Sequence, residues 1–110
     1  MPSTGENTIE YRVLLKNGPN LSLAVKSDLT TLPRRLLAIG LITLENAEEL
    51  GNPMHQEAER ADRLVQFIQR SVQNNCQNYY KFVGVLEQDR RYYDDTLNQL
   101  QEVYRAFQSE

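Results

Sequence analysis

The sequence has few of the residues from which catalytic and metal sites are usually built. Its 110 residues include one cysteine, Cys76, one histidine, His55, and no tryptophan. A single histidine excludes a multi-histidine metal site and makes a catalytic triad difficult to assemble. A single cysteine cannot form an internal disulfide bond, which favours a reducing, cytoplasmic setting. We therefore expect a protein that is not an enzyme and that needs no metal ion or other cofactor.

Long apolar runs and glycine-rich loops are also missing. No run approaches the ~20 apolar residues that a membrane-spanning helix needs, and the five glycines are isolated from one another, so there is no phosphate-binding loop. A net charge of −3 is unfavourable for a protein that must neutralise phosphates. The alternation of apolar and polar residues that marks a half-buried strand does not occur. These absences argue against membrane binding, nucleic-acid binding and a β-sheet.

What the sequence does contain is helical periodicity, and it is clearest in residues 53–75. The apolar residues here recur at i, i+3, i+4, i+7 and i+11, which places them on one face of a helix. They are Ala61, Leu64, Val65, Ile68 and Val72. Asn52 is expected to cap this helix, with Pro53 at its first position. The opposite face is charged, which predicts an amphipathic helix in a bundle.

The segment before this helix predicts three further helices. Apolar residues in 8–16 and 21–25 are separated by Asn17, Gly18 and Pro19, so we expect a first helix that is kinked or split near Gly18. A second helix ends at Gly40, with Ser27 or Asp28 as its cap, although Pro33 would delay its start to about Thr31 or bend it. A short third helix runs between Thr43 and Gly51.

Two apolar stripes after residue 75 predict the last helices. The fifth helix carries Tyr79, Phe82, Val83 and Leu86, and the sixth carries Tyr93, Leu97, Leu100, Tyr104 and Phe107. Residues 88–91 contain no glycine or proline that would force a break, so one long helix is the alternative. The sequence therefore predicts an all-α domain of about six helices over residues 8–107, with tails at 1–7 and 108–110.

The order of these segments resembles a caspase-recruitment domain (CARD) of the death-fold superfamily. The resemblance covers roughly residues 9–105. It rests on LLAIGLIT followed by the acidic Glu45, on Arg60, Ala61 and Leu64 at the start of the fourth helix, and on YYKFVGVLE in the fifth. It implies a six-helix antiparallel bundle of the death-fold type. It also implies a non-catalytic adaptor that associates with another CARD or related death-fold domain, its own copies included, in apoptotic or innate-immune signalling.

The resemblance also implies where such a domain binds its partner. A basic surface on the first and fourth helices meets an acidic surface on the second and third, and such a contact can repeat into an oligomer or filament. The basic residues expected to take part are Arg60, Arg63 and Arg70. The acidic residues are Asp28, Glu45, Glu48 and Glu49. Phe67 is either an exposed anchor for the partner or, as we favour, packed against a neighbouring helix.

Other interpretations of the same residues stay open. The charged patches also fit a surface that only keeps a small domain soluble. A structural bundle that dimerises through residues 92–107 and its fifth helix is the alternative function. An enzyme that uses His55 or Cys76 is the third hypothesis, but the sequence suggests no substrate for it.

Overall fold

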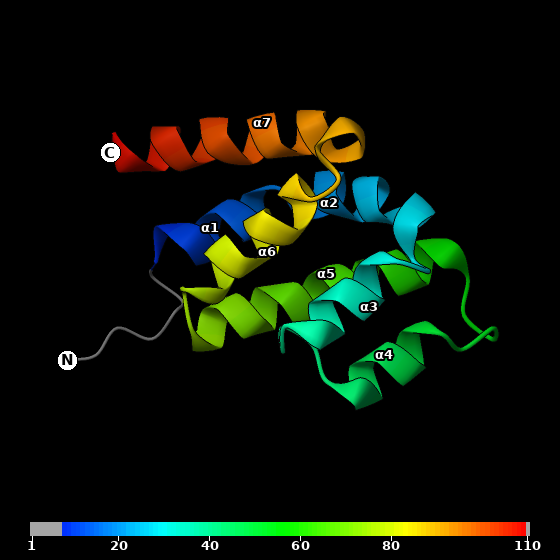
Figure 1. Cartoon of the computed structure of the whole chain (residues 1–110). Helices are drawn as coiled ribbons and strands as arrows, with labels where there is room; N and C mark the ends of the chain where they lie inside the picture. The colour runs from blue at the N-terminus through cyan, green and yellow to red at the C-terminus, as the bar shows by residue number, and fades with distance from the viewer. Residues whose placement is uncertain (1–7, 110) are drawn as a thin grey trace.

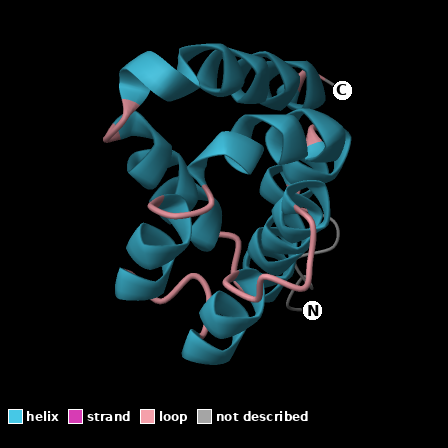
Figure 2. Cartoon of the chain, turned by 90° about the vertical axis from the view of Figure 1, so that its right-hand side faces the viewer, coloured by secondary structure: helices cyan, strands magenta, loops and turns pink. Residues whose placement is uncertain are grey.

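The computed structural model describes residues 8–109 (Figure 1). These residues fold into seven α-helices and one short 3-10 helix, joined by turns and loops. Residues 8–109 contain no strand, as Figure 2 shows, so the all-α prediction is confirmed. The predicted tail at 1–7 and the final residue lie outside the described residues. The helices are α1 (Ile9–Lys16), α2 (Gly18–Val25), η2 (Lys26–Asp28), α3 (Leu32–Ala38), α4 (Leu44–Leu50), α5 (Glu57–Asn74), α6 (Asn78–Glu87) and α7 (Arg90–Gln108).

Helix α5 lies at the centre of the fold, in contact with α1, α2, η2, α4 and α6. All five residues of its predicted apolar stripe are at most 5% exposed. The core is completed by α7, which packs along α1 and also contacts α2 and α6. None of the helices within residues 8–109 combines the length and the apolar character needed to cross a bilayer.

The predicted start of α5 is wrong by four residues. The helix begins at Glu57, after Gln56 in an extended conformation, and not at Pro53. The Asn52 side chain instead accepts a hydrogen bond from the backbone N–H of Met54 at 2.9 Å. A local turn of this kind is a common use of asparagine that competes with helix capping. Pro53 therefore lies in the loop between α4 and α5.

The first helix is split near Gly18, as predicted, and the break falls at Asn17. Asn17 separates α1 from α2 and is only 4% exposed. Its side-chain amide donates to the Val13 carbonyl at 2.9 Å, which offsets the cost of burying this polar group. Pro19 stands in the first turn of α2, where its missing N–H costs nothing. At Gly18 a Cβ atom would lie 3.3 Å from Nε2 of Gln69, so α5 approaches the break closely.

The second predicted helix, α3, begins late because of its proline. Its first residue is Leu32, directly after Thr31, and Pro33 lies in its first turn. The prediction that Pro33 delays the start of this helix to about Thr31 is therefore confirmed. The prediction that Ser27 or Asp28 caps this helix is wrong, since both belong to η2. The Asp28 carboxylate instead accepts a hydrogen bond from the hydroxyl of Tyr93 on α7 at 2.6 Å.

Helix α4 has the boundaries that its sequence predicts. The Thr43 hydroxyl accepts from the N–H of Asn46 at 3.0 Å, and the Asn46 side chain accepts from the N–H of Thr43 at 3.1 Å. This reciprocal pair fixes the start of the helix, and Gly51 ends it. Gly40 has a φ of 81°, which ends α3 at little steric cost.

Helices α6 and α7 are separate, so the alternative of one long helix is wrong. The chain leaves the helical conformation at Asp89, with φ −126° and ψ 57°. Tyr93, at φ −103° and ψ 16°, kinks the first turn of α7. No glycine or proline sets this break. It allows Leu86 and Tyr93, both at most 1% exposed, to enter the same core from different helices.

Candidate interaction surfaces

The predicted basic and acidic surfaces meet within one molecule at the contact between α4 and α5. Arg63 of α5 donates from Nη1 to Oε1 of Glu49 on α4 at 2.5 Å, and its Nη2 lies 3.5 Å from Oε1 of Glu59. The Arg63 and Glu49 side chains are 33% and 41% exposed. A pair this exposed contributes only about 0 to 1 kcal/mol to stability. It does mean that Arg63 and Glu49 are already partnered before any second protein binds.

Arg60 is also used inside the molecule. Its Nη1 lies 3.5 Å from the Leu50 carbonyl at the carboxyl end of α4, and its Nε is buried with no hydrogen-bond partner. A cation at a helix C-terminus is favourable because the unpaired carbonyls carry partial negative charge. His55, in the loop before α5, lies with Nδ1 3.2 Å from Glu59 Oε2. Arg60 therefore joins α5 to α4.

The remaining predicted residues of α5 line a shallow groove of about 520 Å³. Phe67 is half-buried and packs against the core, as the favoured interpretation expected. Arg70 is exposed, and no residue between 8 and 109 forms an ion pair with it. The lining residues are Glu49, Glu59, Asp62, Arg63, Gln66, Phe67 and Arg70. This groove has mixed charge, because its acidic residues offset the two arginines.

The acidic residues of α4 divide between two directions. At about 100° per residue, Leu44, Glu45 and Glu48 fall on the side of α4 opposite Leu50. Leu50 is 2% exposed and Leu44 is 62% exposed, and both glutamates are exposed. Neither glutamate has an ion-pair partner in the described part of the chain. We call Leu44, Glu45 and Glu48 the acidic face of α4.

A tyrosine cluster that the sequence did not reveal joins α1, α6 and α7. The Tyr80 hydroxyl donates to Oε2 of Glu10 at 2.6 Å and lies 2.9 Å from the hydroxyl of Tyr104. Tyr79 stacks on Tyr104 with ring centroids 5.9 Å apart. The helical spacing correctly placed Tyr79 in the core. It gives no sign of the contact with Glu10, which lies 70 residues away from Tyr80 in sequence.

Three tyrosines have a raised pKa in the folded protein, so we expect the fold to lose stability at alkaline pH. Burial raises the pKa of Tyr79 to about 12, and burial with the hydrogen bond to Asp28 raises the pKa of Tyr93. The hydrogen bond to Glu10 is the main cause that raises the pKa of Tyr80. Because the folded state holds these protons more tightly than the unfolded state, the stabilisation is complete below about pH 10 and is lost as the pH rises through about 12.

We therefore expect the helical circular-dichroism signal to collapse on alkaline titration together with the late rise of phenolate absorbance. Both signals should be followed in one titration, so that ionisation and unfolding are compared directly. Ionisation of all six tyrosines near pH 10, with the helical signal unchanged, would contradict these contacts.

The residues considered for chemistry are not gathered into a site. Cys76 is a free, half-buried thiol in the turn between α5 and α6. His55 lies beside Glu59 before α5. Within residues 8–109, no three His, Cys, Asp or Glu side chains are arranged to hold a metal ion.

Comparisons with known protein families, with curated proteins and with solved structures give no match for this chain.

Proposed function

We propose that the chain is a non-catalytic protein–protein interaction module of the CARD type, which assembles with like helical domains, its own copies among them. The residue pattern that resembles a CARD supports this proposal, as does the split first helix that the structure contains. The role in apoptotic or innate-immune signalling belongs to the same proposal.

The acidic face of α4 is the observation that carries the proposal. Arg63, Glu49, Arg60 and Asp28 are bonded inside the molecule. The acidic face instead presents two unpaired carboxylates beside an exposed leucine on a short helix that is capped at its start. An apolar side chain ringed by charge is the pattern of a binding site with an apolar centre and a polar rim. This face would bind a basic surface on the partner.

The alternative, dimerisation through residues 92–107, has less surface to use. Three of the five apolar residues of its stripe on α7, Tyr93, Leu97 and Leu100, are at most 9% exposed. The other two, Tyr104 and Phe107, are half-buried. They pack inside their own molecule, where α7 contacts α1, α2 and α6. Pairing two copies through this stripe would first require α7 to leave its own core.

The proposal predicts that Glu48→Lys abolishes assembly. The substitution reverses one charge at the centre of the acidic face, and like charges placed across an interface cost several kcal/mol. Assembly should be measured by sedimentation velocity over a range of protein concentrations. The helical signal and melting temperature should stay close to those of the unchanged protein, because Glu48 is exposed and unpaired.

Glu102→Lys is the matched control. It makes the same change of charge on the exposed side of α7, away from the acidic face, and should leave assembly intact. Equal losses in the two variants would show that net charge, and not the acidic face, controls association.

A further inference from the structure

A second groove lies between α6 and α7, and its lining differs from that of the groove on α5. One wall is formed by Tyr80, Val83 and Glu87 of α6, which recur at i, i+3 and i+7. The other wall is formed by Leu97, Asn98, Gln101, Arg105 and Gln108 of α7. Its volume is about 430 Å³, within the range of roughly 300 to 1,000 Å³ found for ligand pockets. We call it the α6/α7 groove.

The floor of the α6/α7 groove is apolar and aromatic. Tyr79, Leu100 and Tyr104 lie between the two walls. The hydroxyls of Tyr80 and Tyr104 are held by Glu10, so their rings are fixed in place. Tyr80 remains 46% exposed at the rim. A fixed aromatic surface of this kind offers apolar contact area with little entropy left to lose on binding.

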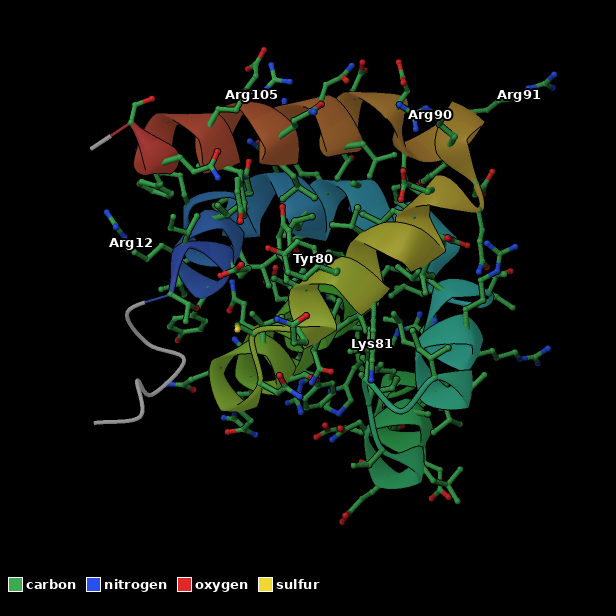
Figure 3. The ribbon with its side chains drawn as sticks, turned by 60° about the vertical axis from the view of Figure 1, so that its left-hand side comes forward. Arg12, Tyr80, Lys81, Arg90, Arg91 and Arg105 are labelled. Atoms are coloured by element: carbon green, nitrogen blue, oxygen red, sulfur yellow. The ribbon has the colours of Figure 1, made fainter. Side chains whose placement is uncertain are left out.

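The α6/α7 groove has an arginine near each end, and only Arg105 is without an ion-pair partner among residues 8–109. Figure 3 shows this side of the molecule, with Arg90 and Arg105 near opposite ends of α7 and Tyr80 on α6 below them. Arg90 forms an ion pair with Glu87, in which Nη1 lies 3.6 Å from Oε2. Both side chains are more than half exposed. Arg105 is exposed, and none of residues 8–109 forms an ion pair with it.

We infer that the α6/α7 groove receives the acidic face of α4 from a second copy of the chain. The two surfaces are complementary in the character of their residues. Leu44 would contact the accessible parts of Tyr80 and Tyr104. Glu45 and Glu48 would face Arg105 at the rim of the groove. This inference rests on the proposed function and specifies which surface of the partner takes up the acidic face.

The positions of the two surfaces determine what kind of assembly would form. Helix α4 lies at the opposite side of the molecule from α7 (Figure 1), so one copy can use both surfaces at once. Because the two halves of the contact are different surfaces, it is a heterologous contact that adds copies in a row unless the rotation closes a ring. The same geometry makes single-surface variants act as caps at the end of such a row.

The test mixes two variants that are each defective in one surface. Arg105→Glu disables the groove and leaves the acidic face intact, and Glu48→Lys does the reverse. We expect each variant alone to stay monomeric by light scattering. An equimolar mixture should form a dimer and nothing larger, because the one intact groove accepts the one intact acidic face. Arg34→Glu serves as the control, since it makes the same charge change on an exposed residue of α3 that lines neither groove, and should assemble like the unchanged protein. Arg70→Glu tests the rival groove on α5.

The possible results separate this inference from the proposed function. Assembly by Arg105→Glu that equals the unchanged protein overturns the α6/α7 groove and leaves the proposed function standing. Loss of assembly in Arg70→Glu would then assign the contact to the groove on α5. An unchanged protein that remains monomeric at every concentration overturns both. Circular dichroism of each variant must match the unchanged protein, and if Arg105→Glu is unfolded, Arg105→Gln replaces it in the same mixture.

Discussion

Phe82→Ala is expected to lower the free energy of unfolding by about 3 to 5 kcal/mol, the range measured for buried Phe→Ala substitutions. Phe82 of α6 is 0% exposed and is among the largest fully buried side chains of the described residues. The cavity would lie in the core that α6 shares with α5 and α7. Since total stabilities are about 5 to 15 kcal/mol, the variant should melt at least ~10 °C lower. Urea unfolding followed by circular dichroism measures the loss.

Phe67→Ala provides the comparison for Phe82. Phe67 is half-buried at the edge of the core and lines the α5 groove. Part of its ring is therefore in water already, and the transfer term is smaller in proportion to the area removed from solvent. Its substitution should cost clearly less than that of Phe82. Equal losses at the two positions would contradict the packing described for α6.

Tyr93 is expected to show a large effect that divides into two parts. Tyr93→Ala removes a ring that is 1% exposed and should cost about 3 to 5 kcal/mol for the cavity alone. Tyr93→Phe keeps the ring and removes only the hydrogen bond to Asp28, which should cost about 1.5 to 3 kcal/mol because the acceptor is charged. Urea unfolding of both variants separates the two contributions.

Asp28→Asn tests whether the second part belongs to the bond with Tyr93. In that background, Tyr93→Phe should cost less than it does alone, because contacting residues are not additive. Identical costs in the two backgrounds would show that Asp28 and Tyr93 are not coupled. That result would remove the link between η2 and α7.

The sequence predicted the parts of the fold that depend on local spacing. The stripe of α5, the break near Gly18 and the bounds of α4 at Thr43 and Gly51 each follow from residues within a few positions of one another. The start of α5 was wrong because Asn52 had two local uses, as a cap or in a turn, and the spacing does not distinguish them. The break at Asp89 depends on the packing of α7 against helices that are distant in sequence. No glycine or proline in residues 88–91 predicts it.

The candidate surfaces were less predictable, because charge in a sequence does not show which charges meet. Arg63 and Glu49 were placed on opposite partner-binding surfaces, yet they are bonded to each other across α4 and α5. Glu45 and Glu48 stay unpaired because they lie on the outward side of the same helix. The α6/α7 groove brings together Tyr80 and Arg105 from two helices, and periodicity within either helix cannot show that their flanks adjoin.

The most direct test of the proposed function is the molar mass of the unchanged chain by light scattering, over a wide concentration range at low and at physiological salt. We expect the mass to rise above the 12.8 kDa of one chain as concentration increases at low salt. We also expect the mass to fall as salt is added, because exposed charges are screened beyond about 8 to 10 Å. A constant mass of one chain under all of these conditions would contradict the proposed function.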